Sequence, residues 1–335
     1  MKRKAIFIAC LSCLIAIGCK RNDEFPDPEV EIPEFNFEKT VSFEENLSAY
    51  EIFAGNPANL IPSSDFQLLE LSSVLFTDYS HKQRLVKIPS GTQMTKRDDG
   101  TISFPNGTVL TKTFFYYHDD RDTSLGKQII ETRLLVKESD QWNVATYLWN
   151  ESQTEATLTL TGHDTAVKWV GQNGASRSTV YHVPSENECM TCHQSNASMT
   201  PLGPTLMRLN RTVERDGEFS NQLSHLQMVG LMEEFSVSEI SKMVDYKDPN
   251  ASIEERGRAY LALNCSHCHN PNAWDVPADR DFDFRYNIPF AATGILYGKD
   301  KILRTVMDEE MPFIGTTMPD DEGVALLVEY IESLD

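Results

Sequence analysis

The chain has 335 residues, of which 50 are Asp or Glu and 30 are Lys or Arg, so its formal net charge at pH 7 is −20. A nucleic-acid-binding protein needs a basic stripe for its phosphate contacts, and this acidity therefore argues against that class. The length is enough for two domains, each with its own core. The negative charge has two interpretations: it keeps the protein soluble, or it steers a basic partner electrostatically.

The N-terminus has the pattern of an export signal. Three basic residues at positions 2–4 precede an apolar run over 5–17. This run is shorter than the apolar stretch that a transmembrane helix usually needs. The sequence Ala16-Ile17-Gly18-Cys19 resembles a bacterial lipobox, although Leu or Val is commoner than Ala at its first position. We therefore predict a lipoprotein signal peptide over 1–18 and a lipid anchor at Cys19. An ordinary signal peptide with a free Cys19 is the alternative.

Residues 19–35 are rich in acidic residues and Pro and contain few apolar ones. Such a composition buries too little surface to fold, so this stretch is predicted to be a tether. The residue after Cys19 is Lys20 and not Asp, which favours the outer membrane. We expect a protein held on the periplasmic side of a membrane or at the cell surface.

The pattern over residues 36–184 predicts an antiparallel all-β domain of sandwich or jelly-roll type. Residues 156–161 alternate between apolar and polar, as a half-buried strand does. Turn pairs such as Asn106-Gly107 separate the candidate strands. Many short strands with this spacing are typical of such all-β domains. The other candidate strands are 83–88, 108–117, 128–136, 142–149 and 165–170.

Two Cys-x-x-Cys-His motifs follow, at residues 189–193 and 265–269. This spacing is typical of covalent attachment of c-type haem. Two thiols one helical turn apart form thioethers with one porphyrin, and the following histidine binds its iron. Zinc, which also takes Cys and His ligands, and disulfides are the alternatives. Each cluster is compact, with His next to the second Cys, and this favours two haems over zinc or disulfides.

The first motif lies in a predicted haem segment over 185–250, which a capping box at its start predicts to begin as a helix. Cys189 and Cys192 are predicted to hold the first haem, with His193 as its proximal ligand. The turn at 201–204 resembles the Gly-Pro turn whose carbonyl orients that histidine in cytochromes c. No single residue stands out as the distal ligand, and a five-coordinate iron without a distal ligand remains an alternative. The candidates are Met199, Met207, Met228, Met232, His182 and His225.

The second motif lies in a predicted cytochrome c-like domain over 251–335, so the whole region after 184 is predicted to be mainly α-helical. Cys265 and Cys268 are predicted to hold the second haem, with His269 as proximal ligand. Met311 is the preferred distal ligand, and Met318 is the competing one. A Met/His pair stabilises ferrous iron and raises the potential.

Two further features belong to this second site. Gly257 and Tyr330 are suited to the contact between the first and last helices of monohaem cytochromes c, where a glycine lets an aromatic ring approach. His267 lies between the two cysteines of the second motif and is not expected to bind the iron of its own haem.

Longer runs extend the pattern beyond the motifs. They are 104–114, 131–135, 147–150, 183–185, 201–204, 221–223, 258–271 and Met311-Pro312. Together with the two motifs they resemble a bacterial family of secreted dihaem c-type cytochromes, over nearly everything after the tether. The resemblance implies a β-rich N-terminal region, two haem sites and electron transfer as the activity. Some relatives are associated with sugar-dehydrogenase-like domains, and no such domain is visible here.

We therefore expect a lipid-anchored, extracytoplasmic dihaem cytochrome that carries single electrons between redox partners. The haem would supply the redox step, and the protein would supply attachment, ligands and electrostatics. The β domain is predicted to dock a dehydrogenase or an electron acceptor beside the first haem. One alternative is a peroxidase-like haem enzyme with an open first iron. Another is a carbohydrate or small-ligand module with a haem relay.

Overall fold

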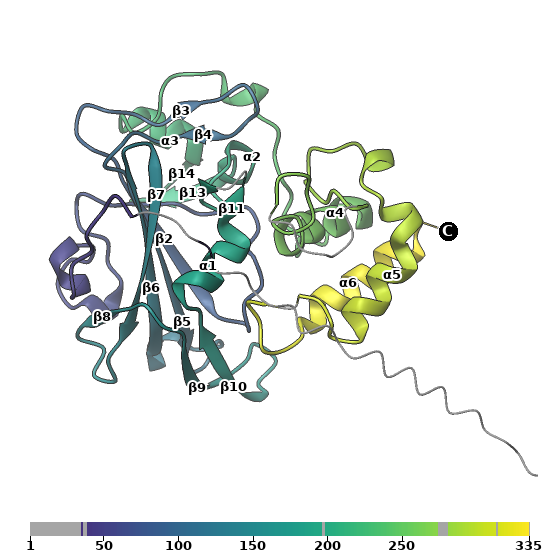
Figure 1. The fold of residues 1–335 in the computed structure, drawn as a ribbon, viewed down its shortest axis with the longest axis horizontal. Coiled ribbons are helices and arrows are strands. Elements are labelled where there is room, and N and C mark those ends of the chain that lie inside the picture. The colour runs from purple at the N-terminus through teal and green to yellow at the C-terminus, as the bar shows by residue number, and fades with distance from the viewer. Residues whose placement is uncertain (1–34, 36–38, 196–197, 274–280, 313, 335) are drawn as a thin grey trace, which may run out of the picture. The chain divides into compact units, whose positions relative to one another are not determined.

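The largest element of the computed structural model is an antiparallel sheet of six strands (Figure 1). The structure describes residue 35 and residues 39–195, 198–273, 281–312 and 314–334. The predicted signal peptide, Cys19 and almost all of the predicted tether lie outside the described residues. The strand order is β1-β2-β5-β6-β7-β8, so the prediction of an antiparallel β-rich region is confirmed. The strands are β1 (Gln67–Leu68), β2 (His81–Lys87), β5 (Val109–Tyr117), β6 (Lys127–Glu138), β7 (Gln141–Trp149) and β8 (Ala156–Thr159).

The segment before β1 covers one face of this sheet. Side chains alternate between the two faces of a strand, and Leu85, Phe115 and Tyr147 point to this face. They pack against Ile52 and Phe66 of the covering segment. The short elements of this segment and of the loops around the sheet are three 3-10 helices and one pair of strands: η1 (Leu47–Tyr50), η2 (Pro57–Asn59), η3 (Thr123–Leu125), β3 (Thr95–Lys96) and β4 (Ile102–Ser103).

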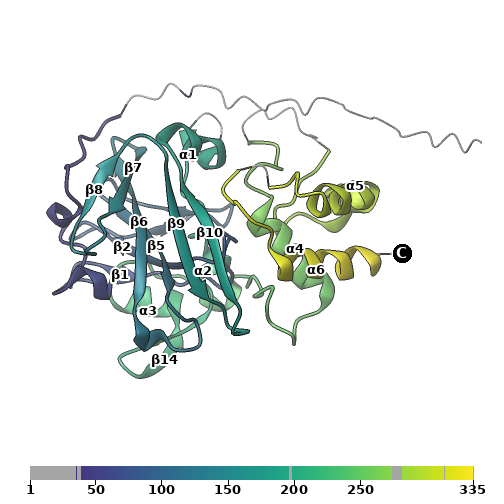
Figure 2. The ribbon, with the colours of Figure 1, turned by 90° about the horizontal axis from the view of Figure 1, so that it is seen from below.

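The opposite face of the sheet is covered by a hairpin and by helical segments. The hairpin consists of β9 (His163–Val170) and β10 (Ser176–Val183), and Figure 2 shows it next to β5. Trp169 and Tyr181 of the hairpin pack against Phe114 and Tyr116 of β5. The second layer is antiparallel as well, but its sheet consists of this hairpin alone, so the finer prediction of a sandwich or jelly roll is not confirmed. After β10 the chain continues into helix α1, which the side chain of Ser185 caps.

The region 185–250 is less helical than predicted, and the prediction of a mainly α-helical region is not confirmed there. At Asp216 and Gly217 the backbone φ angles are 53° and 83°. Two successive positive φ angles at an Asp-Gly pair are typical of a two-residue hairpin turn, which this chain forms in place of a helix. The elements are α1 (Glu186–His193), β11 (Gln194–Ser195), β12 (Ser198–Met199), α2 (Leu206–Leu209), β13 (Thr212–Arg215), β14 (Glu218–Asn221), α3 (Gln222–Met228) and η4 (Val237–Glu239).

The C-terminal part is built around three helices that share an apolar core. Leu263, Ile302 and Leu327 lie in this core, one from each helix. The predicted capping box at Ser185 is formed, and so is a second one at Ser252; they begin the helix that contains the first Cys-x-x-Cys-His motif and the helix that leads into the second. The elements are α4 (Ile253–Asn264), η5 (Phe290–Ala292), α5 (Ile295–Met307) and α6 (Asp321–Glu332).

Helices α4 and α6 meet at two glycines. A Cβ atom placed on Gly257 would lie 2.3 Å from the ring of Tyr330, so the predicted contact between these two residues is confirmed. A second contact, which the sequence analysis missed, repeats the arrangement in reverse. A Cβ atom on Gly323 of α6 would lie 2.2 Å from the ring of Tyr260 of α4. Each helix therefore presses an aromatic ring onto a glycine of the other.

The loop between β1 and β2 joins the sheet to the C-terminal helices. The Asp78 carboxylate accepts hydrogen bonds from the backbone N–H of Thr317 at 2.8 Å and of Met318 at 3.3 Å. The side-chain oxygen of Asn264 accepts one from the N–H of Phe76 at 2.8 Å. The described residues belong to one compact unit. Within them, no helix has both the length and the apolar character needed to cross a membrane.

Candidate cofactor and metal site

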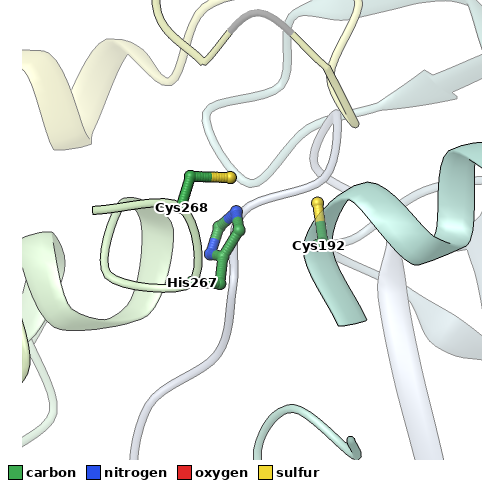
Figure 3. A group of neighbouring side chains, drawn as sticks. All are labelled: Cys192, His267 and Cys268. Carbon is green, nitrogen blue, oxygen red and sulfur yellow. The ribbon is translucent and has the colours of Figure 1, made fainter. Parts of the chain in front are cut away.

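The fold brings the two Cys-x-x-Cys-His motifs against each other. Cys192 lies in the last turn of α1, and His267 and Cys268 lie in the turn that follows α4. The sulfur atoms of the two cysteines and the imidazole of His267 all lie within 4.8 Å of one another (Figure 3). The sequence placed these motifs in separate segments and gave no sign that they meet. Two groups attached at these motifs would therefore be neighbours.

The proximal histidine of the first motif is held by its own backbone loop. The N–H of Thr200 donates to the carbonyl oxygen of His193 at 2.7 Å, and His193 Nδ1 lies 3.0 Å from the carbonyl oxygen of Thr200. A carbonyl only accepts, so Nδ1 carries the proton and the Nε2 lone pair remains available for a metal. Burial, with the nearby charge of Lys112, lowers the pKa of His193 to about 3. The imidazole is therefore neutral, which is the form that binds iron.

This arrangement corrects one detail of the sequence analysis. The carbonyl that orients His193 belongs to Thr200, the residue before the turn at 201–204, and not to that turn. The short pair of strands β11 and β12 returns the chain to the end of α1, which brings Thr200 beside His193. The physical role is the expected one, since the contact fixes the tautomer and the orientation of the ring.

The first motif opens onto a cavity of about 310 Å³, here called the first cavity. Cys189, Cys192 and His193 line it, together with His267 of the second motif. The rest of its wall comes from the sheet, from α2 and α4, and from the loops around them. Burial raises the pKa of the Cys189 thiol to about 11, so this thiol is neutral at physiological pH.

Of the distal candidates named for the first site, only His182 lines this cavity. Met199 and Met232 are buried in the core beside the sheet, and Met228 is 75% exposed at the end of α3. Met207 packs against the core of the C-terminal helices. His225 is half-buried in α3. Among the described residues, therefore, no methionine lines the first cavity, and its histidines are His182, His193 and His267.

His182 lines the first cavity, but carboxylates occupy both of its ring nitrogens. Nδ1 lies 2.7 Å from Asp164, and Nε2 lies 3.0 Å from Glu188. Burial opposes the charge on the ring, but the hydrogen bonds and charges of these carboxylates outweigh it and raise the pKa of His182 above its usual value. The ion group of His182, Asp164 and Glu188 links β10 to α1, the helix that carries the first motif. We assign this ion group a structural role.

The pKa of His182 predicts a pH dependence of stability. The folded state favours the protonated ring of His182. The ring's contribution to the free energy of unfolding is therefore complete below its unfolded pKa of about 6.5, and it is lost as pH rises through the folded pKa. We expect His182→Gln to flatten this part of the pH profile of urea unfolding between about pH 6 and 8. The same change at exposed His163, in the same hairpin, should leave it intact. An unaltered profile in His182→Gln would show that the ion group gives no net stability.

The four residues predicted for the second site line one cavity, here called the second cavity. They are Cys265, Cys268, His269 and Met311. The ring of His269 contacts the rings of Phe282 and Phe284, whose centroids lie 6.0 and 5.3 Å away. Burial raises the pKa of the Cys265 thiol to about 12.

The second cavity measures only about 60 Å³, but it adjoins one of about 290 Å³. Met311 lines both, whereas Met318 lines only the larger one and packs against the aromatic cluster of β5 and the hairpin. A planar group attached at Cys265 and Cys268 would have to occupy both cavities and displace the side chains between them. Met311 lies where these two cavities meet and Met318 does not, so the position of Met311 favours it as the distal ligand of a haem attached there.

The cluster in Figure 3 also has the composition of a zinc site. Cys192, His267 and Cys268 supply three ligand atoms of the kinds that zinc prefers. A structural zinc site usually has four protein ligands, and no fourth His, Cys or carboxylate of the described residues joins this group. Zinc at this position would also leave His193 and His269 without a metal-binding role. Two haems, in contrast, would use all four cysteines of the motifs together with His193 and His269.

Comparison of the chain with protein-family models, with curated proteins and with solved structures gives no match in any of the three.

Proposed function

We propose that this chain is a dihaem c-type cytochrome that carries single electrons between redox partners outside the cytoplasm. The observation that supports it best is that both Cys-x-x-Cys-His motifs line cavities, and that the two motifs lie side by side. Covalently bound haem would supply the one-electron chemistry at both places. Lipid at Cys19 would hold the protein at the outer membrane.

The residues of the chain divide the work as follows. Cys189 and Cys192 would attach the first haem, and neutral His193, oriented by the carbonyl of Thr200, would offer Nε2 to its iron. At the second site His269 and Met311 would offer an imidazole and a thioether from the same cavity. Because a thioether ligand favours ferrous iron, we expect the second site to have the higher potential. Electrons would then enter at the first motif and leave from the second.

The partners would be a dehydrogenase or another electron donor on one side and an electron acceptor on the other. The formal charge of −20 favours association with a basic surface of such a partner. The β region was predicted to dock a partner. In the structure it also supplies strands β2, β5 and β6 to the wall of the first cavity, which supports a second role in holding the first haem.

Two other functions each have an observation in their favour. The first cavity contains no methionine among its described lining residues, which is compatible with an open iron and a peroxidase-like activity. The cluster of Cys192, His267 and Cys268 is compatible with bound zinc. Both alternatives make different predictions for the spectrum of the purified protein.

The spectrum tests the carrier proposal directly. The mature protein would be made in a host that matures c-type cytochromes, and its haem content and reduced spectrum recorded with and without carbon monoxide. We expect two haems per chain and no change with carbon monoxide, because a carrier keeps both irons six-coordinate. A change at one haem would favour the enzyme. A protein without haem would contradict both the carrier and the enzyme.

A further inference from the structure

The main sheet presents three cations in a row to the first cavity. Arg84 of β2 lies directly opposite Lys112 of β5, and Lys112 lies directly opposite Arg133 of β6. All three line the cavity, as does Arg208 of α2. Like charges directly opposite one another destabilise a sheet. A chain with a formal charge of −20 therefore concentrates positive charge at one place on the inner face of its sheet.

Only one cation of the row is neutralised within the described part of the chain. Arg133 forms two hydrogen bonds with the fully buried carboxylate of Glu131, at 2.5 and 2.7 Å. Arg208 donates only to a carbonyl oxygen, that of Ala262 at 3.2 Å. Lys112 lies over the ring of Phe114, with 4.6 Å between Nζ and the ring centroid. No carboxylate of the described residues forms an ion pair with Arg84, Lys112 or Arg208.

The electrostatics of these side chains point to a missing anion. Burial, followed by the charges of Arg84 and Arg133, lowers the pKa of Lys112 well below its usual value. Burial and the charge of Arg208 likewise lower the pKa of Arg84 to about 10. Half-buried charges without partners lose part of their solvation, and an anion among them would offset that cost. The guanidinium groups would bind carboxylates through paired hydrogen bonds.

We propose that Arg84, Lys112 and Arg208 form a carboxylate-binding wall of the first cavity that holds the propionate groups of the haem attached at Cys189 and Cys192. This inference rests on the proposed function and assigns the β-sheet a direct part in binding the cofactor. A free carboxylate from solution has the same chemistry and is the other possible occupant.

The test uses the holoprotein with Lys112→Gln and, as a matched control, the same change at exposed Lys168 of β9. Potentials of both haems would be measured as a function of pH. In Lys112→Gln we expect the potential of one haem to fall, because removal of a positive charge favours the oxidised state. Its redox-linked pKa should rise by about one unit, a tenfold change in proton affinity, because a carboxylate loses a nearby cation. The other haem and both haems of Lys168→Gln should be unchanged.

Arg208→Gln, which leaves the sheet untouched, provides a second variant should Lys112→Gln fold poorly, and it should shift the same haem in the same direction. Two haems with unaltered potentials in both variants would overturn this inference and leave the proposed function standing. Fewer than two haems in the wild-type protein would overturn both. A saturable shift of the wild-type potential by added acetate, absent in Lys112→Gln, would assign the wall to a free anion and overturn the assignment to propionates.

Discussion

Replacing Gly257 by alanine is expected to lower the free energy of unfolding by about 2 kcal/mol. The new Cβ would lie 2.3 Å from the ring of Tyr330, which has no exposed surface. Overpacking of this kind costs up to about 3 kcal/mol, and alanine recovers about 1 kcal/mol through its higher helix propensity. Urea unfolding followed by circular dichroism, on proteins matched in haem content, measures the difference.

A double-mutant cycle separates this contact from other effects of the substitution. Tyr330→Ala removes the ring, so adding Gly257→Ala to it should cost nothing or even stabilise α4 by helix propensity. If Gly257→Ala lowered the free energy of unfolding equally with and without the ring of Tyr330, the contact between these two residues would not be the cause of the loss.

Replacing both cysteines of one motif by serine is expected to remove one haem and to leave the other. Without thiols no thioether forms, so the mass of the denatured chain should fall by one haem in Cys189→Ser/Cys192→Ser and equally in Cys265→Ser/Cys268→Ser. The remaining haem should differ between the two variants in its potential, since Met311 lines the second cavity but not the first.

The same pair of variants distinguishes haem from zinc. A zinc ion held by Cys192, His267 and Cys268 draws ligands from both motifs, so either double variant would lose the whole metal content. Retention of one haem in each variant therefore supports two independent sites, and loss of all metal from both supports the shared zinc site.

Short-range patterns predicted much of the secondary structure. Every candidate strand between 83 and 170 corresponds to a strand of the structure within a few residues, because alternation and turn pairs are local signals. Both capping boxes are also local and are formed. The failures concern layers and helix content. The Asp216-Gly217 hairpin was a local signal that the prediction of a helical region overlooked.

The site was predictable residue by residue but not as an arrangement. Cys265, Cys268 and His269 were named from the motif spacing and Met311 from its place on the loop before the last helix, and all four line one cavity. That Cys192 meets His267 depends on contacts between segments far apart in the chain, which no pattern within either motif encodes. The cation row did leave a trace in the sequence. Lys112 has the same strand parity as Leu110 and Phe114, an inward position at which an apolar residue is expected.

The mass of the intact mature wild-type chain under denaturing conditions tests the central claim most directly. Denaturation releases zinc and any haem that is not covalently bound, whereas thioether-linked haem stays on the chain. The account predicts a mass equal to that of the processed, lipidated polypeptide plus two haems. A polypeptide mass with no added haem, from a host that matures c-type cytochromes, would contradict it.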